Sequence, residues 1–316
     1  MLKKWTAVLL GLLVVTSFSA GCARNTTTQT DDKLKVSVSF DAMKEFVAAV
    51  GKDKVDVSTI IPTGVEPHDF EPKAQDLAAL STAQIFVYNG LGMEGWAEDA
   101  ISAANNEKLV VVDASKGADV ITKDAEEDEH AEHAEDAEDA EEGHSHGKYD
   151  PHLWLSLKGA QVEAKNIRDA LVSVDPENKA FYEKNCDEFV TALEGLYNEY
   201  SGKFQATTKK DFVTGHAAFA YLCRDFGLEQ NSVRDTFADG EPTAQQLAQL
   251  VEYCRENQVT TIFAEEMASP EVSETLANEV GAKVETIYTI ESPDGELTYL
   301  ERMESNLSKI YASLTK

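Results

Sequence analysis

The chain has 316 residues and a large excess of acidic side chains, with 57 Asp and Glu against 28 Lys and Arg and a formal net charge of −29. This charge argues against nucleic acid as a partner, because the phosphates would be repelled, and it suits a soluble protein that meets cations. The length exceeds what a single core usually supports, and the 42% hydrophobic content is enough for real cores. We therefore expect two lobes of ordinary domain size.

The N-terminus has the pattern of an export signal. Two lysines precede an apolar stretch at 7–15, which is too short to span a bilayer, and small residues then lead to Cys22. Small residues before a cysteine resemble the bacterial lipobox, in which the cysteine is lipidated and becomes the mature N-terminus. We predict a signal peptide at 1–21, a lipidated tether at 22–32 and an extracytoplasmic protein anchored to the cell membrane. An ordinary signal peptide with an incidental cysteine is the alternative.

Strands alternate with helices in the first part of the chain after the tether. The strands are short runs rich in apolar and β-branched residues, bounded by glycine, proline or polar residues. Such alternation indicates a parallel sheet built from right-handed crossover units. In chain order the pattern predicts a strand at 34–40, a helix at 42–50, a strand at 55–61, a helix at 73–81, a strand at 83–89, a helix at 95–105 and a strand at 108–113.

A run of acids and histidines follows these elements. Residues 124–142 hold twelve Asp or Glu, and four of the seven histidines lie in or beside this stretch. This composition cannot bury a core, so we predict a disordered loop at about 119–148. Paired imidazoles among carboxylates bind transition metals, which makes these histidines candidate auxiliary ligands for weak zinc capture, whereas a solvated linker is the alternative. The four histidines are His130, His133, His144 and His146.

The second half of the chain begins with two helices. Apolar residues at steps of four and three mark one buried helical stripe at 159–174. A cap and a first-turn proline at Asp175-Pro176 then start a long helix at 176–205, which we interpret as a rigid bridge between an N-terminal lobe at 33–175 and a C-terminal lobe at 206–316. In the second lobe the pattern predicts strands at 211–214, 232–234, 260–264 and 284–290 and helices at 217–226, 243–257, 270–280 and 297–314.

Three cysteines remain after Cys22, at positions 186, 223 and 254. An exported compartment permits disulfides, but three thiols allow at most one pair. Cys223 and Cys254 both fall on predicted helices of the second lobe, so this pair is slightly favoured. Three small buried thiols, with Cys186 among them, are an equally good interpretation.

The three histidines outside the acidic run are His68, His152 and His216, and each lies beside a proline or glycine after an apolar run or at a turn. In open parallel sheets the loops beyond the carboxyl ends of strands face the ligand crevice, so these side chains can meet between the lobes. Glu265 and Glu291 also end or follow predicted strands. Three neutral imidazoles and one carboxylate satisfy tetrahedral Zn²⁺, whereas Mn²⁺ prefers more oxygen ligands. We therefore predict one zinc site in the interlobe cleft.

A ligating imidazole needs its second ring nitrogen held by a hydrogen-bond acceptor. Asp69 and Asp150 lie close in sequence to His68 and His152, and they are the candidates for that role.

Several segments, taken together and in order, resemble the zinc and manganese (cluster A-I) solute-binding lipoproteins of bacterial ABC transporters, most of all the zinc-uptake branch. The resemblance implies an α/β fold of two lobes, each a small parallel sheet flanked by helices, bridged by one long rigid helix. It implies one metal in the interlobe cleft, bound by His68, His152 and His216. A histidine-rich insertion before the second of these histidines is typical of the zinc branch. The segments are FDAMKEFVAAVG, PTGVEPHDFEP, YNGLGMEGW, DPHLWLS, GHAAFAYL, GEPTAQQL and IFAEE.

The sequence leaves the fourth ligand open. In the family that ligand is an acid from the loop after the final strand, or a water. We choose Glu291, with Asp294 second and Glu265 or a water as the remaining alternatives. Some zinc-uptake members place a glutamate immediately before the first histidine. Here Pro67 occupies that position, so Glu66 does not simply inherit the role.

The resemblance implies a binding protein rather than an enzyme. We expect an extracytoplasmic monomer that captures Zn²⁺ with high affinity and delivers it to an ABC-transporter permease for import. A manganese-binding member of the same family is the alternative. A zinc-dependent hydrolase is less favoured, because no HExxH motif and no nucleophile elbow occur. A surface adhesin with incidental metal binding is a third hypothesis.

Overall fold

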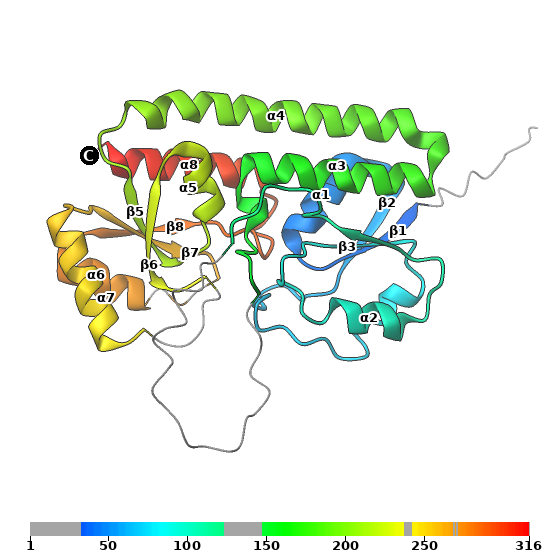
Figure 1. Ribbon diagram of the computed structural model, residues 1–316, viewed down its shortest axis with the longest axis horizontal. Coiled ribbons are helices and arrows are strands. Elements are labelled where there is room, and N and C mark those ends of the chain that lie inside the picture. Colours follow the sequence, from blue (N-terminus) through cyan, green and yellow to red (C-terminus); the bar gives the residue numbers. More distant parts are fainter. Residues whose placement is uncertain (1–32, 123–146, 237–241, 268, 270, 316) are drawn as a thin grey trace, which may run out of the picture. The chain divides into compact units, whose positions relative to one another are not determined.

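The computed structural model describes residues 33–122, 147–236, 242–267, 269 and 271–315. Residues 33–316 cluster as one compact unit. Two four-stranded parallel sheets flanked by helices form this unit, which confirms the predicted α/β class and its two lobes (Figure 1). The predictions for the signal peptide, for Cys22 and for His130, His133, His144 and His146 lie outside the described residues.

The first sheet has the strand order β2-β1-β3-β4, with β1 (Leu34–Val38), β2 (Val55–Thr59), β3 (Ile85–Tyr88) and β4 (Val110–Asp113). The crossovers contain the helices α1 (Asp41–Gly51) and α2 (Ala97–Ala104). The predicted helix at 73–81 is wrong in length, because only the 3-10 turn η2 (Ala78–Ser81) forms there. The carboxylate of Asp76 accepts the backbone N–H of Lys73 at 2.8 Å, and residues 74–77 form turns rather than a helix.

The second sheet repeats this topology in the order β6-β5-β7-β8, with β5 (Asp211–His216), β6 (Glu229–Arg234), β7 (Thr261–Glu265) and β8 (Lys283–Ile287). Its helices are α5 (Ala220–Phe226), α6 (Ala244–Glu256) and α7 (Glu271–Val280). The strand order reverses between the central strands β5 and β7. Connections leave such a point in opposite directions and open a crevice beyond the carboxyl ends of the strands. His216 and Glu265 are the last residues of these two strands.

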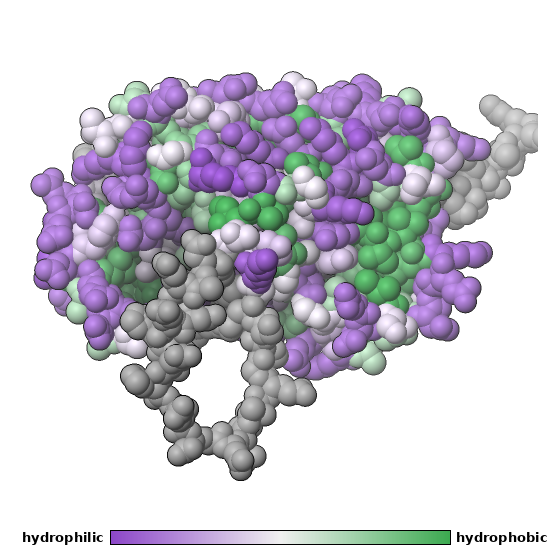
Figure 2. All heavy atoms as spheres, in the orientation of Figure 1, coloured by the Kyte–Doolittle hydropathy of each residue, from purple (hydrophilic) through white to green (hydrophobic). Residues whose placement is uncertain are grey.

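Helices α3 (Leu157–Val174) and α4 (Lys179–Ala206) join the two sheets. Ser156 caps α3, because its Oγ accepts the backbone N–H groups of the second and third helical residues. Helix α4 has 28 residues and a length of about 42 Å, and Figure 1 shows it running alongside both lobes, as predicted for the bridge. Figure 2 shows mostly hydrophilic side chains along this edge. Within the described residues, no helix is both long and apolar enough to cross a bilayer.

The C-terminal helix α8 (Tyr299–Leu314) follows the second sheet and contacts α1 and α4. One cluster of buried apolar side chains accordingly extends from Leu34 in β1 to Leu314 in α8. Arg302 of α8 also donates to Asp41 of α1 at 2.7 Å, and both side chains are buried. The lobes therefore share a hydrophobic core and a buried ion pair in addition to the bridging helix. The predicted boundaries at 175 and 205 stay predictions.

The favoured disulfide between Cys223 and Cys254 is wrong, because both cysteines are free and buried, as is Cys186. Successive residues of a strand face opposite sides of its sheet, and Phe212 and Val213 of β5 belong to different core clusters. Cys223 packs in the cluster of Phe212 and Cys254 in that of Val213. The second sheet therefore separates the two thiols, and the alternative of buried thiols describes them.

Candidate metal centre

The three predicted histidines come together in one cluster. Nε2 of His152 lies 3.1 Å from Nε2 of His68 and 3.2 Å from Nε2 of His216. Two imidazole nitrogens that bind one tetrahedral zinc at about 2.0–2.1 Å are roughly 3.3 Å apart. The separations within the cluster therefore match the spacing that a shared Zn²⁺ requires.

His68 lies in the long connection between β2 and β3 and is the most accessible of the three. It is partly exposed, whereas His152 and His216 are buried. The backbone N–H of Gly64, earlier in the same loop, donates to Oγ of Ser292 at 2.8 Å. This bond ties the His68 loop to the segment after β8. His68 therefore stands on the solvent side of the cluster, on a loop that is fastened to the other lobe.

His152 is fully buried just before the 3-10 turn η4 (Leu153–Leu155). Oδ1 of Asp150 accepts both the backbone N–H and the Nδ1–H of His152, each at 2.9 Å. A proton held on Nδ1 leaves the lone pair on Nε2, the atom that faces the other two histidines. Of the two acids considered for orienting an imidazole, Asp150 is the one placed against His152. Tyr221 in turn donates its hydroxyl to the carbonyl of Asp150 at 2.7 Å.

His216 is held by the strand ends of the second sheet. Its backbone N–H donates to Oε1 of Glu265 at 2.8 Å. Gly215 permits this close approach, because a Cβ atom there would lie 2.3 Å from Oε2 of Glu265. Burial, followed by the nearby His152 and His68, lowers the pKa of His216 well below its ordinary value of 6.5. The ring is therefore neutral near pH 7, the form that binds a metal.

Glu291, in the loop after β8, approaches the cluster on the side of His68. Its ligand atom groups with those of Glu66 and His68 within 4.8 Å. Oε2 of Glu291 accepts the hydroxyl of Thr289 at 3.0 Å, whereas the buried Oε1 has no hydrogen-bond partner. Burial, and after it the nearby Glu66 and Glu266, raises the pKa of Glu291 well above 4.5. A bound cation would supply the partner that Oε1 lacks and would favour the ionised form.

Three other acids lie near the sequence positions considered for the fourth ligand, and each has a different environment. Asp294 is exposed and bonds to Tyr288, away from the histidines. Glu265 holds the backbone of His216, and burial raises its pKa to about 7. Glu66, which the sequence argument set aside because of the intervening proline, lies beside Glu291. The unpartnered Oε1 is therefore the observation that favours Glu291, and Glu66 is a second carboxylate in the same group of ligand atoms.

A cavity of about 570 Å³ opens next to the cluster, and its lining includes Asp150, Ala217 and Thr236. Asp150 both lines this cavity and binds Nδ1 of His152, whereas none of the three histidines lines it.

Two parallel α/β lobes joined by a long helix, and a cluster of imidazoles from separate segments of the chain, define a metal-binding solute-binding protein. Residues 36–313 match the family described as the periplasmic zinc-uptake complex component A, ZnuA. The chain belongs to this family. It is therefore the metal-binding component of an uptake system that works with an ABC permease, and it is not an enzyme.

Known relatives are similar to this chain over nearly its whole length. The high-affinity zinc uptake system protein ZnuA of Bacillus subtilis (strain 168) is 41% identical over 322 residues, which is 99% of each chain. The zinc-binding lipoprotein AdcA of Streptococcus pneumoniae (strain TIGR4) is 33% identical over 98% of this chain, which spans 60% of that protein. The solved structure of a zinc-bound ZnuA deletion mutant has a TM-score of 0.75 and 30% identity, covering 90% of this chain and 98% of that one.

Proposed function

We propose that this protein captures Zn²⁺ outside the cytoplasm with His68, His152, His216 and Glu291, and that it delivers the ion to the permease of an ABC importer. The observation that carries the proposal is the approach of three imidazole Nε2 atoms to 3.1 and 3.2 Å in a member of a zinc-uptake family. The names of the Bacillus and Streptococcus relatives support zinc as the cargo.

Zinc fits the ligand set better than manganese does. Three imidazole nitrogens and one carboxylate make a tetrahedral set of borderline donors, which suits Zn²⁺, whereas Mn²⁺ favours oxygen ligands in larger number. Glu66 offers one further carboxylate nearby, the feature that a manganese site would use. Competition between the two metals therefore tests the choice of cargo directly.

The experiment is metal analysis of the purified protein, followed by competition of each metal against a chromophoric chelator. We expect one tightly bound zinc per chain that an excess of manganese does not displace. Displacement of zinc by an equal concentration of manganese would overturn zinc as the cargo.

We also propose that Cys22 is lipidated and that residues 22–32 tether a monomer to the outer side of the cell membrane. The small residues before Cys22 support the anchor, and the relative AdcA is described as a lipoprotein. A Cys22→Ser variant should leave the membrane fraction and appear in the soluble extracytoplasmic fraction. Retention of that variant on the membrane would contradict the anchor.

The histidines of the acidic run are proposed to bind additional zinc weakly. They are His130, His133, His144 and His146. Deleting residues 124–147 should remove only weak zinc equivalents in a titration and leave one tight site. Loss of the tight site on deletion would show that the ligands are placed wrongly.

A further inference from the structure

The segment that carries Glu291 is held by a second glutamate, Glu266, which directly follows β7. Oε2 of Glu266 accepts the backbone N–H of Thr289 at 2.8 Å, and Oε1 accepts that of Ile290 at 2.9 Å. One carboxylate thus binds two successive N–H groups immediately before Glu291. Glu266 belongs to neither group of clustered ligand atoms found among the described residues, so it is distinct from the candidate ligands.

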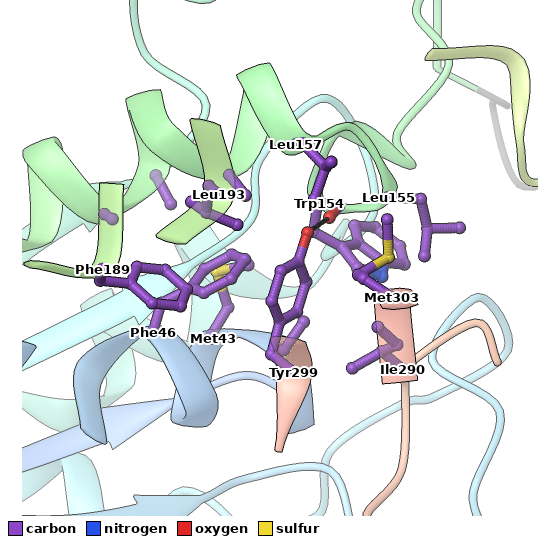
Figure 3. Close-up of a cluster of buried hydrophobic side chains, with 14 of the residues drawn as sticks. Met43, Phe46, Trp154, Leu155, Leu157, Phe189, Leu193, Ile290, Tyr299 and Met303 are labelled. Carbon is purple, nitrogen blue, oxygen red and sulfur yellow. Dashed lines mark hydrogen bonds between the residues drawn. The ribbon is translucent and has the colours of Figure 1, made fainter. Parts of the chain in front are cut away.

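Ile290 needs such a restraint because its backbone is strained. Its φ is +61°, in the left-handed region that a β-branched residue rarely adopts. Such a conformation persists only where the surroundings impose it, and it concentrates at functional sites. The side chain of Ile290 is fully buried in the cluster that contains Trp154, Tyr299 and Met303 (Figure 3).

The rest of the segment is fixed on both sides of the strained residue. Nε1–H of Trp154 donates to the carbonyl of Thr289 at 2.7 Å. After Glu291, Arg302 donates to the carbonyl of Ser292 at 2.8 Å, and Oγ of Ser292 accepts the N–H of Gly64. The backbone is therefore fastened before and after Glu291, and its side chain enters the site with Oε1 unpartnered.

We infer that Glu266 is a positioning residue for metal binding, which holds Thr289 and Ile290 in the conformation that directs the Glu291 carboxylate toward the histidine cluster. The inference rests on the proposed function and deepens it. Glu266 does not bind the ion and acts through Glu291. Glutamine has nearly the same shape, but its NH₂ group cannot accept a hydrogen bond. Glu266→Gln therefore breaks one of the two hydrogen bonds and places the NH₂ group against a backbone N–H, so that two donors face each other.

The test compares Glu266→Gln with Glu291→Gln in zinc competition and in Co²⁺ absorption spectra. Substitution of groups that support metal ligands commonly lowers affinity 10- to 100-fold, and we expect a loss of this size for Glu266→Gln. The Co²⁺ ligand-field spectrum should change in both variants, because each alters the carboxylate that Glu291 would present to the ion. A merely structural role for Glu266 would leave that spectrum as in the wild type.

The matched control is Glu301→Gln. Oε2 of Glu301 also accepts a backbone N–H and a hydroxyl, both from Thr298 at 2.8 Å, but at the start of α8 and outside the site. This variant should keep wild-type affinity and spectrum. The thermal midpoint of the metal-free protein, measured for each variant, separates a change in affinity from a change in folding.

Thr289→Val supplies a second test should Glu266→Gln fail to fold. It keeps the N–H that Glu266 binds but removes the Thr289 hydroxyl, which donates to Glu291 at 3.0 Å and lies 3.4 Å from Oε2 of Glu266. A smaller loss of affinity with a changed Co²⁺ spectrum is therefore expected. The inference is overturned if wild-type protein binds zinc tightly and the variants keep its affinity, or lose affinity with an unchanged spectrum. Failure of the wild type to bind zinc would instead overturn the proposed function itself.

Discussion

Replacing His152 with alanine should remove tight zinc binding while leaving the fold in place. His152 is the central member of the cluster, because the nitrogens of the other two histidines lie 3.1 and 3.2 Å from its Nε2. It is also fully buried, and Asp150 holds its Nδ1, so its Nε2 is fixed toward the other two histidines. The substitution deletes one donor from the proposed set of four.

The expected loss can be worked from the number of donors. Zinc sites with four protein ligands bind with about 10–16 kcal/mol at pH 7, which is about 2.5–4 kcal/mol per ligand when shared evenly. Since 1.4 kcal/mol is a factor of ten, the loss is roughly 10²- to 10³-fold in affinity. A water that enters the space left by the imidazole would restore one weak ligand, so the lower end of this range applies if the site admits water.

The assay is competition for Zn²⁺ against a chromophoric chelator at pH 7.5, with the thermal midpoint of the metal-free protein as a test of folding. Cys223→Ala is the matched control. Cys223 is buried and lines the cavity beside Asp150, and it lies outside the groups of candidate ligand atoms. A His152→Ala protein that keeps its affinity within threefold, with the control unchanged, would refute the assignment of this histidine.

Three further outcomes are expected. Because the pKa of His216 is lowered below 6.5, the unfolded chain takes up a proton there that the folded chain excludes, so the contribution of His216 to metal-free stability should fall as pH decreases from 7.5 to 5.5. Buried glutamates with a raised pKa, such as Glu265 and Glu291, act with the opposite sign in both proteins, so the measurement is the thermal midpoint of the wild type minus that of His216→Gln. This difference should decrease as pH falls, and an increase would have the wrong sign. Asp150→Asn weakens the hold on Nδ1–H of His152 and should lower zinc affinity 10- to 100-fold without loss of circular dichroism. Asp41→Asn leaves the buried guanidinium of Arg302 without its carboxylate and should lower the free energy of unfolding by about 3–5 kcal/mol in urea titrations, and a change below 1 kcal/mol would contradict this account.

The histidines could be predicted because their positions follow from the pattern of strands. His68 and His216 lie at or after strands whose apolar residues are evident, and the carboxyl ends of parallel strands face a common crevice. His152 carries its own orienting acid two residues earlier, at Asp150, and this short-range pair is visible in sequence. Local pattern, together with the resemblance to the family, therefore sufficed to select these residues as candidates.

The remaining features depend on contacts between distant residues, which no local pattern specifies. Glu66 was discounted because Pro67 separates it from the first histidine, yet the loop brings it beside Glu291. The role of Glu266 depends on backbone N–H groups 23 and 24 residues away, and any residue except proline supplies such a group. The predicted pairing of Cys223 with Cys254 was wrong for a similar reason, because the sequence pattern of a helix does not show on which face of the sheet the helix packs.

Hydrogen bonds from backbone N–H groups to carboxylates support the candidate ligands from both lobes. Asp150 accepts the N–H of His152, Glu265 accepts that of His216, and Glu266 accepts the two that precede Glu291. A buried carboxylate is unfavourable without donors, and backbone N–H groups at loops and strand ends are otherwise unpaired, so each bond satisfies both partners. The lobes share one hydrophobic core and cannot separate without exposing it. The geometry of the site is therefore set by these acids and the short segments they hold, which is why substitutions that leave every ligand in place should still change zinc affinity.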